Sequence, residues 1–307
     1  MLGSALRQAL AVRNLHAVQM VRHGQLSAVQ IQWDPTATPS VPPHETWRLE
    51  GLSAAIHLSG SNIAAHRWTP AYKREMAESR IGSTGALART LADLRQPPHT
   101  LLIASAAGIY GDRGNELLDE NSPPGSGFLA DLCRQWEEAA RPAVYAGIRV
   151  VHLRFGAILG PVEKSAPGAL AHMLPLFRLG LGGPLGSGRQ WMSWISLADA
   201  IAAIVFAIGS PHISGPVNVT SPHPVTNAEF TRALAGALHR PAFLRAPAFA
   251  LRLALGQMAD EALLASARVL PAKLQAAGFH FIHPGIGQAL GAALQPQPAE
   301  MEPKLTP

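Results

Sequence analysis

The sequence is poor in cysteine, tyrosine and long apolar runs, and each shortage excludes a class of protein. A single cysteine, Cys133, cannot form an internal disulfide, so a reducing cytoplasm is the expected location. No run of about 18 apolar residues free of charge occurs, so no membrane span is predicted. The opening residues show no basic segment, apolar block and cleavage site of a secretory signal. The basic residues are scattered without aromatic platforms, which argues against a nucleic-acid partner.

The composition that remains is that of a globular α/β protein. Of the 307 residues 48% are apolar and 15% charged, which allows a sizeable core and excludes wholesale disorder. Short apolar segments alternate with segments of helical periodicity, which predicts a doubly wound parallel sheet with helices on both faces. The predicted strands are 16–21, 29–33, 54–59, 99–104 and 149–154, and the predicted helices are 4–12, 70–94 and 128–140.

The alternation weakens after Gly160, and the rest of the chain is expected to be mostly helical. Capping boxes at 196–199 and 226–229 predict helices over 200–208 and 230–239. The segment 240–294 is rich in alanine and leucine and is expected to form a small helical lobe. The proline-rich tail 295–307 is predicted to be disordered.

The motif that normally opens a dinucleotide-binding fold is incomplete in this sequence. Gly3 leads directly into the first predicted helix, like the last glycine of a phosphate-binding loop, but the strand and loop that should precede it are missing. Loss of a central strand leaves two neighbours unpaired, at about 1–3 kcal/mol for each buried orphan group. We expect that the true start lies upstream, or that the chain is a truncated product with impaired cofactor binding.

Other pieces of a cofactor site are present at the ends of predicted strands. Arg22 follows the first one, where the adenosine ribose should lie, and a guanidinium there suits a 2′-phosphate, hence NADP rather than NAD. Leu58, Ser59 and Gly60 end another strand and allow a ligand to approach the backbone. A surface arginine and an ordinary turn glycine are the alternative interpretations.

Several longer segments carry a resemblance to a known family. The chain resembles the extended short-chain dehydrogenase/reductase superfamily, and within it the atypical branch of NAD(P)-dependent epimerase/dehydratase-like sugar-nucleotide epimerases that have an extra C-terminal domain. The resemblance covers about Leu2 to Leu294. The segments that carry it are 55–62, Arg67-Trp68 with Ser79-Arg80, 105–111, Trp136-Glu137, 154–160, 180–188, 193–195 with Asp199, and 215–218.

The resemblance implies a cofactor site and a domain division. It implies NADP contacts at Val21, Arg22, Leu58, Ser59, Glu75, Arg80 and Ala157. The remnant of the phosphate-binding loop adds Gly3, and the end of the strand 54–59 adds Gly60. A solvated helix face is the alternative for Glu75 and Arg80. The expected division is an NADP-binding Rossmann-like domain over 1–160, a substrate-side lobe over 161–239 and a family-specific segment over 240–294.

The catalytic pair of the superfamily is absent. Its chemistry needs a tyrosine with a lysine four residues later, and none of the three tyrosines has one. If Glu137 marks the helix register of the family, Leu129 and Cys133 occupy those positions, and a shift by one residue gives Ala130 and Arg134 instead. The catalytic residues are therefore unknown, with Ser105 and Tyr110 as weak candidates and packing as the alternative for Tyr110. No metal site is predicted, since His280 and His283 lack further ligands nearby.

The sequence does not identify the substrate. Arg178, Arg189 and Gln190 are candidates to bind a phosphate, and Trp191 and Trp194 to stack on a base or sugar, with packing as the alternative for the two tryptophans. The leading interpretation is an NADP-binding oxidoreductase or epimerase acting on a small molecule such as a nucleotide sugar. The alternatives are a non-catalytic NADP(H)-binding sensor or scaffold, and an inactive remnant.

Overall fold

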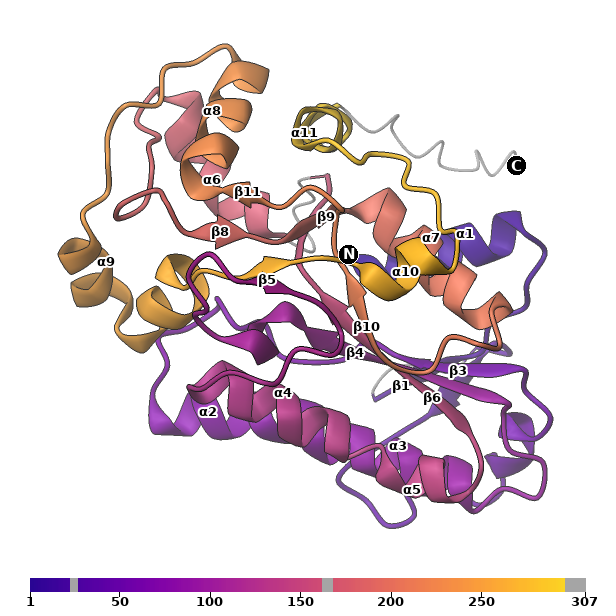
Figure 1. The fold of residues 1–307 in the computed structure, drawn as a ribbon. Coiled ribbons are helices and arrows are strands. Elements are labelled where there is room, and N and C mark those ends of the chain that lie inside the picture. The colour runs from indigo at the N-terminus through magenta and orange to yellow at the C-terminus, as the bar shows by residue number, and fades with distance from the viewer. Residues whose placement is uncertain (23–26, 162–167, 296–307) are drawn as a thin grey trace, which may run out of the picture.

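The computed structural model describes residues 1–22, 27–161 and 168–295. Its centre is a four-stranded parallel sheet in the order β10-β6-β4-β3 (Figure 1). The strands are β3 (Ala54–His57), β4 (Thr100–Ala106), β6 (Arg149–Phe155) and β10 (Gly215–Val219). The predicted Rossmann-like parallel sheet is thereby confirmed.

Helices cover both faces of this sheet, which explains why its central strands are apolar along their length. Leu101, Leu102 and Ile103 of β4 are fully buried. One face carries α2 (Pro70–Ala77), α3 (Ser83–Ala92), α4 (Phe128–Glu138) and α5 (Arg141–Tyr145), and the other carries α1 (Leu2–Val12) and α7 (Leu197–Gly209) (Figure 1).

The helix predicted over 70–94 is interrupted. Thr69 caps its start by accepting a hydrogen bond from the Tyr72 amide, and Pro70 takes the first helical position. A π-helical turn over Glu78–Gly82 then separates α2 from α3. Such turns have no signal in hydrophobic periodicity, and this one carries Arg80.

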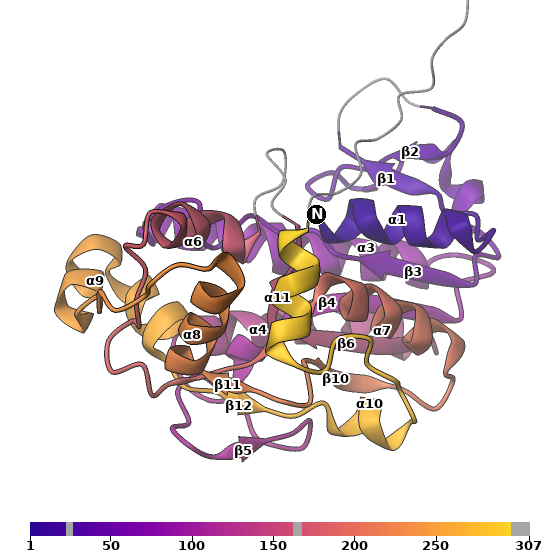
Figure 2. The same cartoon turned by 90° about the horizontal axis from the view of Figure 1, so that it is seen from above.

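The first two strands form a sheet of their own. β1 (Gln19–Val21) and β2 (Gln30–Gln32) pair in parallel, and among the described residues neither is paired with β3. Figure 2 shows β1 and β2 beside β3, with α1 lying over the face of the strands. The two sheets share one core, in which the Trp33 and His57 rings meet edge to face at 5.6 Å. Within the described residues, the β1–β2 sheet and the main sheet are therefore not joined by strand pairing.

The rest of the chain forms a lobe of helices and two-stranded sheets beside the carboxyl end of the main sheet (Figure 1). This confirms the expected helical C-terminal region. The helices are α6 (Ala169–Arg178), α8 (Asn227–Leu238), α9 (Ala248–Leu255), a π-helical turn (Ala259–Leu264), α10 (Ala272–Ala276) and α11 (Ile286–Leu294). The sheets pair β5 (Leu117–Leu118) with β12 (Arg268–Val269), β7 (Ala157–Leu159) with β9 (Trp194–Ser196), and β8 (Trp191–Met192) with β11 (Val225–Thr226).

The two predicted capping boxes differ in the structure. The box of Thr226 and Glu229 is complete. Ser196 caps α7 through the Asp199 amide, but the Asp199 carboxylate accepts from the Ile282 and His283 amides instead of reaching back to the Ser196 amide. This carboxylate therefore fastens the C-terminal segment to α7, which a local pattern does not reveal.

Two further predictions meet the limits of the description. Apart from Gln295, the tail predicted to be disordered lies outside the described residues. In the described part of the chain no helix combines the length and apolar character needed to cross a membrane.

Candidate functional site

The predicted cofactor residues gather at one edge of the molecule because parallel strands end on the same side. Arg22 follows β1, Leu58 to Gly60 follow β3, and Ala157 follows the end of β6 after one residue. Ser59, Gly60 and Arg22 are exposed there, and Val21, Leu58 and Ala157 are half-buried. The edge thus offers accessible backbone from three strands and one guanidinium.

His57 is the last residue of β3, and its side chain is buried. Burial, with a smaller contribution from the positive charge of Arg22, lowers the pKa of His57 from 6.5 to about 4. The His57 ring is uncharged at neutral pH, and its Nε2 is 3.0 Å from the Ser83 hydroxyl.

Arg80 holds the loop that follows β3 from beneath. Its guanidinium donates to the Ser61 carbonyl at 2.8 Å and stacks over the Trp136 ring. A Cβ built on Gly60 would lie 3.1 Å from the Arg80 guanidinium carbon, so only a glycine fits against it without displacement. Arg80 is buried, whereas Glu75 one turn earlier is exposed. The resemblance implied a cofactor contact for both residues, but the structure buries Arg80 and leaves Glu75 at the surface.

The start of α1 fits an anionic group. Among the described residues no side chain caps this helix, and its first turn carries no acidic residue, so within that part of the chain its first amides are available to an acceptor. Gly3 is exposed, and a Cβ built on it would meet no atom within 4 Å. Open space and free amides at this point suit the phosphates of a dinucleotide.

Ser105 and Tyr110, the two weak catalytic candidates, belong to a buried polar network. The Ser105 hydroxyl donates to Glu137 Oε1 at 2.7 Å, and Arg154 donates to both oxygens of the same carboxylate at 2.8 Å. Arg154 also donates to the Tyr110 hydroxyl at 3.0 Å. Tyr110 has no exposed surface, and burial raises its pKa. Neither hydroxyl is placed to meet a substrate.

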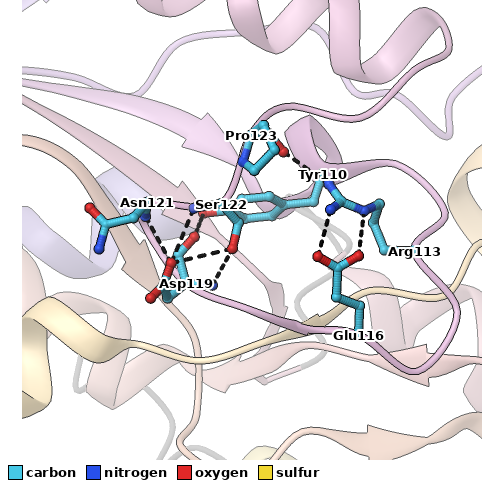
Figure 3. A network of polar contacts seen from close by, with 7 residues as sticks. All are labelled: Tyr110, Arg113, Glu116, Asp119, Asn121, Ser122 and Pro123. Carbon is cyan, nitrogen blue, oxygen red and sulfur yellow. Dashed lines mark hydrogen bonds and ion pairs between the residues drawn. The ribbon is translucent and has the colours of Figure 1, made fainter.

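The Tyr110 phenol is also tied to the loop that follows it. Its hydroxyl lies 2.9 Å from the Asp119 carbonyl oxygen and 2.8 Å from Asn218 Oδ1, two acceptors that share its single proton. Figure 3 shows the ring pointing into the turn that Asp119 and Ser122 close, with the Arg113–Glu116 ion pair beside it. The interpretation of Tyr110 as a packing residue agrees with this geometry.

Leu129 and Cys133, which the Glu137 register predicts at the positions of the usual tyrosine and lysine, lie one turn apart on α4. Leu129 has no ionisable group. Cys133 is 2% exposed, and burial together with the Glu137 charge raises its pKa to about 12. A neutral thiol at this depth is not a nucleophile.

A cavity of about 260 Å³ opens next to these positions, and no sequence pattern indicated it. It lies between the turn after β4, the start of α4 and the C-terminal segment 252–265. Its polar side chains come from regions far apart in the sequence, which is why local motifs missed them. The lining residues are Gly108, Gly111, Asp112, Ser126, Leu129, Ala130, Arg252, Asp260, Glu261, Leu264 and Ala265.

The residues proposed for phosphate and base recognition are only partly accessible. Trp194 is fully buried and donates to the His223 carbonyl, and Gln190 is buried and donates to two carbonyls. Trp191 stacks under the Arg268 guanidinium at 4.2 Å. Arg178 and Arg189 are exposed. The two arginines are exposed and Trp191 is half-buried, so these three keep surface for a ligand contact, whereas Trp194 and Gln190 do not.

Comparison with known proteins gives the family. Residues 1–219 match the model of the NAD dependent epimerase/dehydratase family. The chain belongs to this family. Residues 246–293 match a domain of unknown function, DUF1731, so the resemblance to extended dehydrogenase/reductase proteins with an extra C-terminal domain is confirmed. The boundaries predicted at 160 and 239 stay a prediction.

Named relatives extend over nearly the whole chain. It is 46% identical to the epimerase family protein Mb2239 of Mycobacterium bovis, over 95% of this chain and 94% of the relative. The crystal structure of human epimerase family protein SDR39U1 with NADPH has a TM-score of 0.85 at 32% identity, covering 95% of both chains. A nucleoside-diphosphate sugar epimerase from Corynebacterium glutamicum has a TM-score of 0.75 at 33% identity, over 96% of this chain and 56% of that one. A nicotinamide cofactor is thereby supported.

Proposed function

We propose that this protein binds NADP(H) along the carboxyl edge of its sheet and uses it in an oxidoreductase or epimerase reaction on a small molecule such as a nucleotide sugar, in the cytoplasm. The position of Arg22 carries the proposal, because a guanidinium after this strand suits a 2′-phosphate. The human relative crystallised with NADPH and the Corynebacterium sugar epimerase support it.

Different residues of the chain hold different parts of such a cofactor. The first-turn amides of α1 around Gly3 suit the pyrophosphate, and Val21 with Arg22 suits the phosphorylated ribose. The backbone of Leu58 to Gly60, held from beneath by Arg80, offers a rigid surface beside them. By the family resemblance, Glu75 and Ala157 complete the set. When bound, the nicotinamide supplies hydride chemistry.

Binding titrations of NADPH and NADH by calorimetry test the cofactor. Loss of charge-assisted hydrogen bonds in Arg22→Ala should weaken NADPH binding by about tenfold to a hundredfold and leave NADH binding unchanged. Arg95→Ala is the matched control, since Arg95 is exposed and precedes β4 at the opposite edge of the sheet. Wild-type protein that binds no NADPH, or an Arg22→Ala protein that binds it normally, contradicts the proposal.

A second candidate is a non-catalytic NADP(H)-binding sensor, which Leu129 and Cys133 favour because neither passes a proton. Two assays separate them: loss of NADPH fluorescence with carbonyl compounds detects a reductase, and analysis of the sugar products after incubation of nucleotide sugars with the oxidised cofactor detects an epimerase, which regenerates its cofactor. An enzyme turns over at least one of these substrates, whereas a sensor binds NADPH and turns over none.

A further inference from the structure

The cavity beside α4 is lined by both polar and apolar side chains. Asp112, Asp260 and Arg252 are polar and exposed, and Leu129 and Leu264 are apolar and half-buried. Arg252 Nε donates to Asp260 Oδ1 at 2.8 Å, and Asp112 Oδ1 accepts from the Gly114 and Ser266 amides at 3.2 Å. No hydrogen bond within the described residues engages Oδ2 of either aspartate. Two carboxylate oxygens therefore remain available to hydroxyl donors from a ligand.

The place that an anion would take in this cavity is already filled. Glu261 accepts from the Phe128 and Leu129 amides at 3.1 and 2.8 Å, so its carboxylate satisfies the start of α4. Gln257 fixes the same carboxylate from its own segment. An anionic ligand group would have to displace Glu261 while facing two more carboxylates.

The cations nearby do not offset this charge inside the cavity. Arg252 is paired with Asp260. Arg67 donates to the Leu253 carbonyl, and Lys73 contacts Gln257 and lies over the Phe128 ring; neither lines the cavity. Three carboxylates against one guanidinium leave the lining net negative.

The volume sets the size of the ligand. About 260 Å³ is below the roughly 300–1,000 Å³ of pockets that hold drug-sized molecules. It suits one hydroxylated ring, whose C–H face packs on Leu129 and Leu264, and a nucleoside diphosphate attached to it would lie outside.

We propose that this cavity, walled by the C-terminal domain of unknown function, binds the uncharged polyhydroxylated ring of the substrate and rejects a ring that bears a carboxylate. The proposal rests on the proposed function, because it places this ring next to the position that the family's catalytic tyrosine normally takes. Asp112 and Asp260 bind hydroxyl groups, and Glu261 closes the anion position.

The test uses the full chain saturated with NADPH and matched pairs of ligands, glucose against glucuronate and UDP-glucose against UDP-glucuronate. Calorimetry should show each neutral ligand binding tenfold or more tightly than its uronate, because like charges are brought together in the second case. The Asp112→Asn/Asp260→Asn protein should weaken the neutral ligands and reduce this preference at least threefold. Asp131→Asn, on the exposed side of the same first turn of α4, should change neither.

Each alternative result decides against the proposal. A uronate that binds as tightly as its neutral partner overturns it, as does an unchanged preference in the double variant or the absence of binding by every neutral sugar. Failure of NADPH itself to bind refutes the proposed function instead, and is measured first.

Discussion

The buried side chain of His57 makes the free energy of unfolding depend on the pH of the solution. The unfolded chain takes up a proton near pH 6.5, but folded His57 does so only near pH 4. Protons therefore favour the unfolded state between these values, and stability that is full above pH 6.5 is lost as the pH falls toward 4. A shift of this size corresponds to about 3 kcal/mol.

Urea unfolding between pH 7 and pH 4 measures this effect. The free energy of unfolding should fall by up to about 3 kcal/mol more in the wild type than in His57→Gln. His152 keeps part of the slope in the variant, because burial also lowers its pKa. His44→Gln, at an exposed position, should behave as the wild type, and equal slopes in all three proteins would contradict the assignment.

Arg154 and Glu137 form the centre of the buried network below the candidate site. Their side chains are 7% and 14% exposed. Arg154→Met leaves the carboxylate without its bidentate partner and should lower the free energy of unfolding by about 3–5 kcal/mol. Adding Glu137→Leu removes the orphaned charge and should restore part of this loss. Urea titrations measure both, and a double variant less stable than the single one would count against the pairing.

For single residues, the sequence predicted the chemical role of a side chain better than its burial and its hydrogen-bond partners. Arg22 and Gly60 could be proposed from their places after apolar strands. The burial of Ser105 and Tyr110 could not, because it depends on Glu137, Arg154 and Asn218 arriving from other elements. The cavity carboxylates could not be found either, since Asp112 and Asp260 are distant in sequence.

Among the elements, the glycine-rich loop 180–188 depends on a close backbone approach. A Cβ built on Gly183 would lie 1.9 Å from the Leu244 carbonyl oxygen, in the segment that leads to α9. Gly183→Ala should therefore separate loop and segment and lower the melting temperature by several degrees. Gly236→Ala is the matched control, because Gly236 lies inside α8 with open space around its Cβ position, and it should raise stability by up to about 1 kcal/mol. Equal effects of the two changes would refute the role of the approach.

Hydrophobic periodicity predicted the elements where one face is buried and failed where tertiary contacts decide. It predicted β4, β6 and α4, and the local Thr-x-x-Glu pattern predicted the capping box of Thr226. It missed the π-helical turn at Arg80 and the short strands β5 and β12, which exist because they pair with each other across the chain.

At the scale of the whole molecule, the two unjoined sheets predict uneven stability. β1 and β2 contribute few ladder bonds and are half-exposed in part, whereas β4 is paired on both sides. In native-state hydrogen exchange the amides of β1 and β2 should exchange at least tenfold faster than those of β4 and β6. NADPH that bridges β1 and β3 should slow the first group selectively, and uniform protection across both sheets would contradict this expectation.

The single thiol of the chain allows the rate of local opening around α4 to be measured. Cys133 is shielded by the packing of α4 on the sheet, and its pKa of about 12 keeps it protonated. An alkylating dye added to the native protein can then react only through transient exposure of this helix. The labelling rate therefore measures how often this helix opens, and no engineered cysteine is needed.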